Sequence, residues 1–143
     1  MYANTGLLLA RIVMLMPMFI KTLFLALLFV SGSALAEWRF FSEGLISGNK
    51  FYIDPATVRK DGNMRTGWEK VEIKTAGTDE VRSTRAKFEI DCKKETILFL
   101  TEAGFAEPNL MGKLLSDIDY PYATPKLIAP ETSNYTLMQK VCK

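Results

Sequence analysis

The sequence predicts an α+β fold: a single antiparallel sheet of about six strands, with a C-terminal helix stapled to the sheet by one disulfide. Between residues 37 and 115, short segments alternate apolar and polar residues with the two-residue period of strands that bury one face. Near the C-terminus, the apolar residues Leu137 and Val141 instead recur at helical spacing. The cysteines Cys92 and Cys142 fall on a predicted strand and on this helix.

Residues 1–36 have the pattern of a signal peptide. An unbroken apolar run at residues 23–30 follows Lys21, and the small residues Ala34 and Ala36 form an A-x-A cleavage site. We therefore expect the protein to be exported and cleaved after Ala36.

The mature domain is expected to span residues 37–143, while residues 1–17 exceed what a leader needs and indicate an over-extended start. The alternative is an uncleaved anchor. Only 15 uncharged residues separate Lys21 from Glu37, whereas a spanning helix needs roughly 20. Since no cysteine near the cleavage site could carry a lipid, we expect a protein that is not lipidated and has no membrane span after cleavage.

The charge balance gives no reason to expect a nucleic-acid partner. The chain has 18 basic and 16 acidic residues, and the leader contains Arg11 and Lys21, which leaves 16 residues of each sign in the mature domain. A domain near neutrality has no overall field that would attract it to nucleic acid. A local patch must therefore bind any charged partner.

Two cysteines in an exported domain indicate one disulfide, between Cys92 and Cys142. In the chain-entropy model, closing a loop of this length destabilises the unfolded chain by about 4 kcal/mol. The alternative is that the two residues are unrelated buried thiols.

The expected strands follow from the alternating pattern and from aromatic and β-branched residues. They are residues 37–42, 50–53, 64–73, 84–92, 95–101 and 110–115. The fourth has the clearest pattern, because Ala86, Phe88 and Ile90 alternate with Arg85 and Lys87. One face of this strand is therefore expected in the core and the other in water.

The apolar residues of the third strand change phase along its length. Thr66 and Trp68 share one parity, and Val71 and Ile73 have the other. We expect either a β-bulge near Glu69 or a strand end that is partly covered on both faces.

The fifth strand is apolar on both faces, with Ile97 and Phe99 on one and Leu98 and Leu100 on the other. This pattern predicts a central strand, or one covered by the end of the chain or by a partner subunit. Together with the exposed edges of the sheet, it allows a homodimer.

The remaining segments are expected to be connections and one helix. Residues 74–82 and 103–109 are predicted loops, the latter because it contains Gly104 and Pro108. Residues 116–130 contain three prolines and are expected to form an extended connection. A short helix is expected within residues 131–143.

A structural turn motif contains Tyr52, Asp54, Pro55, Gly62 and Asn63. It predicts a strand, one helical turn, a tight reversal and another strand. Asp54 can cap the turn, Pro55 has the backbone angle of a first helical residue, and Gly62 and Asn63 tolerate the positive φ of a hairpin. These residues therefore indicate architecture rather than a binding site.

The residues that catalysis or metal binding would need are scarce. The chain has no histidine, and a disulfide would remove both thiols as nucleophiles. Asp117 and Asp119 lack the spacing of a calcium loop. We therefore expect no enzymatic activity, no cofactor and no metal site.

A basic group is the candidate site for a protein partner. It comprises Arg82, Arg85, Lys87, Lys93 and Lys94. The alternative is an ordinary solvated strand face, since single exposed charges need no special role.

Several of these features occur together in one known family. They are an early Trp38, the stretch 52–55 leading to 62–63, Asp91 and Cys92 followed by basic residues, a late Pro130, and the terminal Val141 and Cys142. With this order and spacing, residues 37–143 resemble the surface-adhesin protein E family. The resemblance implies an antiparallel sheet of about six strands with a C-terminal helix held by the disulfide.

The resemblance also implies a non-enzymatic module that binds host matrix or serum proteins. The founding adhesin is an outer-membrane lipoprotein, and this chain departs from it because it has no cysteine for lipidation. The alternative is a soluble periplasmic envelope protein, such as an inhibitor or an assembly factor, with no adhesive role. The expected location is therefore the periplasm, the cell surface or the medium.

Overall fold

The computed structural model describes residues 37–143. The predicted signal peptide, residues 1–36, and its cleavage after Ala36 lie outside the described residues. The elements are β1 (Arg39–Glu43), β2 (Lys50–Ile53), η1 (Pro55–Thr57), β3 (Arg59–Asp61), β4 (Met64–Glu72), β5 (Ser83–Asp91), β6 (Thr96–Glu107), η2 (Pro108–Leu110), β7 (Met111–Asp119), β8 (Lys126–Leu127) and α3 (Ser133–Val141).

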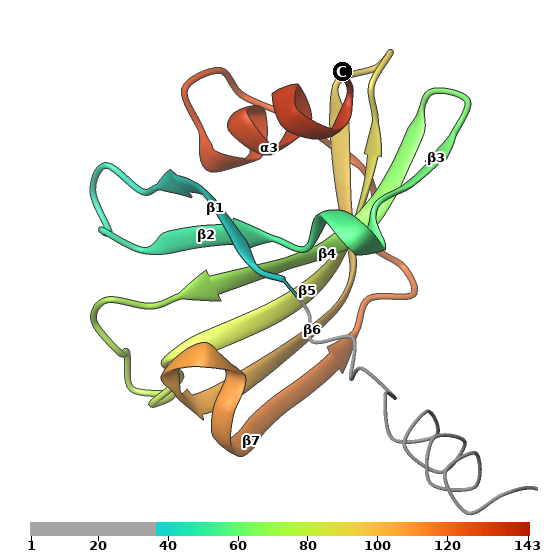
Figure 1. The fold of residues 1–143 in the computed structure, drawn as a ribbon. Coiled ribbons are helices and arrows are strands. Elements are labelled where there is room, and N and C mark those ends of the chain that lie inside the picture. Colours follow the sequence, from blue (N-terminus) through green and yellow to red (C-terminus); the bar gives the residue numbers. More distant parts are fainter. Residues whose placement is uncertain (1–36) are drawn as a thin grey trace, which may run out of the picture. The chain divides into compact units, whose positions relative to one another are not determined.

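The predicted fold class is confirmed: one antiparallel sheet is covered on one face by α3 (Figure 1). Its main order is β1-β2-β4-β5-β6-β7, with β3 also paired to β4 and β8 also paired to β6. The sheet has eight strands rather than about six. The two additional strands, β3 and β8, are short. β3 shares one edge of β4 with β2, on the other side of Pro55. β8 shares one edge of β6 with β7, on the other side of Pro121 and Pro125. Proline has no N–H to continue a ladder, so each edge partner divides in two.

The turn motif has the predicted architecture. Asp54 is buried and its Oδ1 accepts a hydrogen bond from the Ala56 N–H at 3.0 Å, with Pro55 at the first position of η1. The Thr57 hydroxyl donates to the Asp54 carbonyl at 2.7 Å and accepts from the Trp68 N–H at 3.1 Å, which fastens the turn to β4. In the reversal that follows, Gly62 has a φ of +53°. Asn63 is not among the positive-φ residues, so only the glycine needs the left-handed region.

The β-bulge predicted near Glu69 does not occur. β4 pairs with β2 and β5 without a register shift, and its residues are buried or half-buried on both faces, which agrees with the alternative of partial cover on both faces. Trp68 lies on one face, while Glu69 lies on the face that packs under α3 and is 5% exposed. The change of phase reflects this buried carboxyl group rather than an extra residue.

The segment at residues 103–109, expected to be a loop, is mostly strand. β6 continues to Glu107, and β7 continues to Asp119 instead of ending near residue 115. Gly104 lies inside β6, at a position with no room for a side chain. A Cβ there would lie 2.6 Å from Ser116 Oγ and 3.2 Å from Val81 Cγ2. This glycine therefore marks close packing rather than a strand end.

The strand that contains Leu98 and Leu100 is central, which agrees with one of the two predictions for it. β6 has β5 along one edge and β7 and β8 along the other. A homodimer through the sheet edges stays a prediction, and it now concerns β1 and β7, the outer strands of the described sheet.

The core lies between the sheet and α3, where Leu137, Met138 and Val141 are buried as expected. These side chains pack with buried residues of the strands, notably Phe88 and Ile90. The helix begins after Thr132, whose hydroxyl accepts from the Tyr135 N–H at 3.2 Å. The predicted disulfide is confirmed, with a Cys92 to Cys142 Cα distance of 5.7 Å. Within residues 37–143, no helix is long and apolar enough to cross a membrane.

Candidate functional site

The sheet face opposite α3 presents aromatic and charged side chains in two rows that cross the strands. The first row, from β1 to β7, is Phe40, Tyr52, Lys70, Arg85, Ala103 and Asp117. The second, from β4 to β7, is Trp68, Lys87, Thr101 and Asp119. We call these ten residues the open face.

Aromatic rings contact two of the three cations of the open face, Lys70 and Arg85. The Lys70 ammonium lies 4.4 Å from the centroid of the Tyr52 ring and 5.9 Å from that of the Trp38 ring. The Arg85 guanidinium lies 5.1 Å from the Trp68 centroid. Phe40 packs edge-on against Tyr52, with centroids 5.8 Å apart, and remains 54% exposed. Cations over ring faces are attracted by the ring quadrupole, and these contacts orient them.

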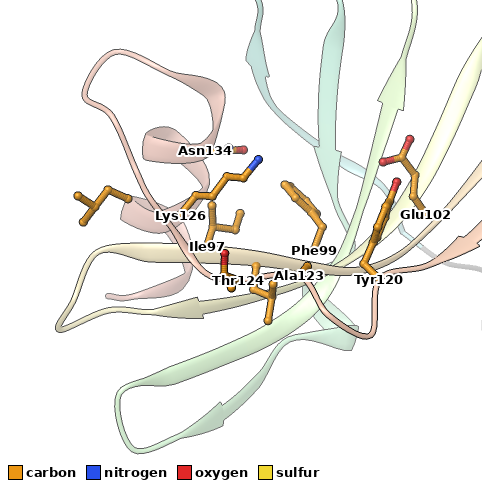
Figure 2. A pocket seen from close by; sticks show the side chains of 10 residues that line it. Ile97, Phe99, Glu102, Tyr120, Ala123, Thr124, Lys126 and Asn134 are labelled. Atoms are coloured by element: carbon orange, nitrogen blue, oxygen red, sulfur yellow. The ribbon is translucent and has the colours of Figure 1, made fainter.

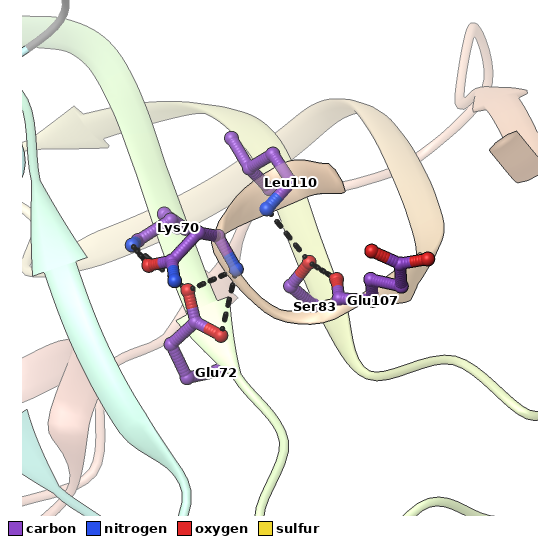
Figure 3. A network of polar contacts seen from close by, with 6 residues as sticks. Lys70, Glu72, Ser83, Glu107 and Leu110 are labelled. Carbon is purple, nitrogen blue, oxygen red and sulfur yellow. Dashed lines mark hydrogen bonds and ion pairs between the residues drawn. The ribbon is translucent and has the colours of Figure 1, made fainter. Parts of the chain in front are cut away.

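Lys70 is fixed by a polar network as well as by the rings (Figure 3). Its Nζ lies 2.8 Å from Glu72 Oε1 and donates to Asn109 Oδ1 at 3.2 Å. The Asn109 N–H donates to both Glu72 oxygens, at 2.9 and 3.1 Å. The Lys70 side chain is only 5% exposed, so its charge stabilises the face and is not available to a partner.

The same network holds η2 against one end of the open face. The hydroxyl of the fully buried Ser83 donates to the Glu107 carbonyl at 2.6 Å and accepts from the Leu110 N–H at 3.0 Å (Figure 3). Asn109 and Leu110 have φ values of +60° and +61°, which let the chain turn tightly at this point. The hydrogen bonds of Ser83 compensate for part of the strain of these two residues.

The structure does not bring the five predicted basic residues into one patch. Arg85 and Lys87 lie on the open face, with Arg85 exposed and Lys87 half-buried. Arg82 precedes β5, whereas Lys93 and Lys94 follow it. A nine-residue strand separates the two ends by roughly 27 Å. Of the five predicted basic residues, Arg85 and Lys87 are the two that lie on the same face of the sheet.

Lys93 and Lys94 belong to the β5–β6 turn. Both backbone N–H groups donate to Asp91 Oδ1 at 3.0 Å, and the Lys94 ammonium lies 3.7 Å from the same carboxylate. The hydrogen bond from the Lys94 N–H is the main cause of a lowered pKa for Asp91. The turn therefore uses the backbone N–H groups of both residues and the side-chain charge of Lys94.

The aromatic half of the open face is not evident from the sequence. Tyr52 belongs to the predicted turn motif, and no pattern in the sequence marks Trp68 and Lys70 as binding residues. Their grouping depends on the register of β2, β4 and β5, which the residue pattern does not define. The alternation within β5 predicts which of its faces is buried, but not which residues of neighbouring strands lie side by side.

No group of three acidic, histidine or cysteine side chains is placed to hold a metal ion anywhere in residues 37–143. The open face combines planar rings, the exposed Arg85 guanidinium, the ammonium groups of Lys70 and Lys87, and carboxylates on the edge strand β7. Such a mixture is typical of protein interfaces, where aromatic residues and arginine are enriched.

Comparison with known proteins agrees with this architecture. The family described as surface-adhesin protein E matches residues 38–143. No curated protein matches the chain. Crystal form II of Haemophilus influenzae protein E aligns with a TM-score of 0.52 at 15% identity, covering 76% of this chain and 91% of that one. A selenomethionine form of the same protein aligns at 0.51 and 16% identity, covering 76% and 90%.

At such identity the solved structures show that the fold is shared. The family match extends over the sheet, the disulfide and α3, which are the features that the resemblance implies. The chain belongs to the surface-adhesin protein E family.

Proposed function

We propose that this chain is an exported, non-enzymatic adhesin-like module that binds a host matrix or serum protein through the open face. The observation that carries the proposal is the stacking of Arg85 on Trp68, beside Lys87, on a sheet face that α3 leaves uncovered. Family membership supports a protein partner.

The geometry favours a partner with acidic groups near the middle of the sheet. Arg85 and Lys87 lie on β5, and Asp117 and Asp119 lie two strands away on β7. A partner would therefore meet positive charge at the centre and negative charge at one edge, an arrangement that fixes its orientation. Arginine and tryptophan in a desolvated contact are the residues that most often dominate binding energy.

Charge reversal on the open face tests the site. Arg85→Glu/Lys87→Glu should weaken binding to immobilised serum proteins and matrix extract by at least about tenfold, because one exposed anchor and its charged neighbour are lost. Lys93→Glu/Lys94→Glu is the matched control, since it makes the same charge change at the strand end, outside the open face. Binding isotherms by surface plasmon resonance measure both. Normal binding by Arg85→Glu/Lys87→Glu, with loss of binding by Lys93→Glu/Lys94→Glu, would contradict a site on the open face and place it at the β5–β6 turn.

Location separates the proposed adhesin from the alternative, a soluble periplasmic inhibitor or assembly factor. Protease treatment of intact cells should degrade an adhesin displayed at the surface, while a periplasmic protein would be protected until the outer membrane is opened. An immunoblot against the domain, with a known periplasmic protein as control, gives the result. Complete protection would argue for the periplasmic alternative.

A further inference from the structure

A cavity of about 460 Å³ lies on the α3 side of the sheet, between β6 and the segment that leads to β8 (Figure 2). Its floor is Ile97 and Phe99, and its walls include Glu102, Tyr120, Lys126 and Asn134. It lies on the face opposite the open face, because Phe99 and Glu102 pair with Phe88 and Ala86 rather than with Arg85 or Lys87. Its volume is within the range of small-molecule sites.

The cavity follows from the way in which β6 is paired. β7 pairs with β6 from Thr101 to Glu107, and β8 pairs with Thr96 and Ile97, which leaves a gap between them. Backbone hydrogen bonds fix both ends of the bridging segment, from the Tyr120 N–H to the Leu100 carbonyl and from the Ile128 N–H to the Glu95 carbonyl, each 2.9 Å.

Two prolines keep this bridging segment away from β6. Pro121 and Pro125 have no N–H group, so residues 121–125 cannot continue the ladder. The segment runs beside the edge of β6 between two fixed ends, and the cavity lies between β6, this segment and Asn134 of α3. The site is therefore formed by the fold itself and does not require a ligand to create it.

Opposite charges line the two ends of the cavity. Glu102 and Lys126 lie on either side of the Phe99 ring (Figure 2). Among the contacts of the described residues, neither side chain forms an ion pair or a hydrogen bond. An unpaired charge at each end of an apolar floor matches a ligand that carries both charges.

The groups around Glu102 leave a single negative charge at its end of the cavity. Desolvation and the charge of Glu102 raise the pKa of Tyr120, so its hydroxyl stays neutral and its oxygen can accept a hydrogen bond from a ligand ammonium. Glu69, two strands away in the same row, is buried with Oε2 unpartnered, and its pKa is about 8. Glu69 is therefore mostly neutral at pH 7, and Glu102 supplies the charge.

The spacing of the two charges limits the ligand. Lys126 pairs with Ile97, five residues before Glu102 on β6, which is roughly 16 Å along an extended strand. Glu102 and Lys126 flank Phe99 (Figure 2), and each side chain spans part of this separation, so the ligand has to bridge the remainder. A free α-amino acid is too short, whereas an extended peptide of two or three residues spans about 7–10 Å.

We propose that this cavity binds a short free peptide, with its terminal ammonium at Glu102 and Tyr120 and its terminal carboxylate at Lys126. The body of the peptide packs on Phe99 and Ile97. This binding does not depend on the proposed function, because it uses other residues on the other face of the sheet.

Tri-alanine and two blocked forms of it test the proposal on protein purified after export of the full-length chain. Tri-alanine should give saturable shifts of the amide signals of Phe99, Glu102 and Lys126 in NMR titrations. N-acetyl-tri-alanine and tri-alanine amide each lack one charge and should bind at least about tenfold more weakly. The absence of saturable shifts with millimolar tri-alanine, or equal binding of all three peptides, would overturn the proposal.

Two variants assign the ends. Glu102→Gln should remove the preference for a free amine and keep that for a free carboxylate, and Lys126→Met should do the reverse. Glu43→Gln and Lys140→Met make the same changes at exposed positions outside the cavity and should bind like the wild type. Thermal melts check that each variant is folded. A folded Glu102→Gln variant that still distinguishes tri-alanine from its acetylated form would contradict the assignment.

Discussion

Glu69→Gln should make the protein more stable than the wild type at pH 9, by on the order of 5 kcal/mol, while the two proteins should be similar at pH 4. Burial, and to a smaller extent the charge of Glu102, raise the pKa of Glu69 to about 8. Glutamine resembles the protonated carboxyl group in shape and stays neutral at every pH. The substitution therefore removes the free-energy cost of a buried charge.

The sign of the pH dependence follows from proton binding. In the unfolded chain the carboxyl group has its ordinary pKa of 4.5, and in the folded chain it titrates near 8. Between these values the folded state binds the additional proton, so the free energy of unfolding falls as the pH rises from about 4.5 to about 8. Outside this window, Glu69 does not contribute to the pH dependence of the free energy of unfolding. The stabilisation by the protonated form is fully present below the lower value and is lost above the upper one.

Urea denaturation of both proteins at several pH values measures this effect. The difference in the free energy of unfolding should open across the window and be constant above it. Glu102→Gln is the control, because it removes the smaller cause of the shift and leaves the burial of Glu69 in place. This variant should keep most of the pH dependence. A wild type and a Glu69→Gln variant with parallel pH profiles would contradict the buried neutral carboxyl group.

The sequence is sufficient to predict the parts of the fold that depend on local periodicity. Ala86, Phe88 and Ile90 define the buried face of β5, and Leu137 and Val141 define the buried side of α3. The disulfide follows from the number of cysteines and the expected export. Each of these inferences needs only the spacing of residues along one segment.

Features that depend on neighbouring strands are not predictable in the same way. Glu69 has the parity of the core face, yet a carboxyl group in the core contradicts the usual pattern, and this conflict leads to the incorrect bulge prediction. Gly104 leads to a loop prediction because glycine is common in loops. The reason for this glycine is the close approach of Val81 and Ser116, which is a tertiary contact that the sequence does not show. The open face joins Tyr52 to Lys70 across a strand pair whose register the pattern leaves undefined.

Replacing both cysteines, as Cys92→Ala/Cys142→Ala, should lower the free energy of unfolding by about 4 kcal/mol. The bond joins residues 50 positions apart, from the end of β5 to the last turn of α3. Without it the unfolded chain gains the conformational freedom of that loop. A loss of this size is a large share of the net stability of a small domain.

The effect should be concentrated at α3, which has nine residues and would be marginal as an isolated helix. Besides its apolar side, α3 is held by the hydrogen bond from Arg65 Nε to the Val141 carbonyl at 3.0 Å. Urea denaturation measures the total loss, and amide hydrogen exchange measures the opening of α3 relative to β5. Arg65→Met is the control, since it removes this polar contact, together with the bonds from Arg65 Nη1 to the Gly62 and Met64 carbonyls, and keeps the covalent link. It should cost about 1–2 kcal/mol. A double cysteine variant as stable as the wild type, with α3 equally protected from exchange, would show that packing alone holds the helix on the sheet.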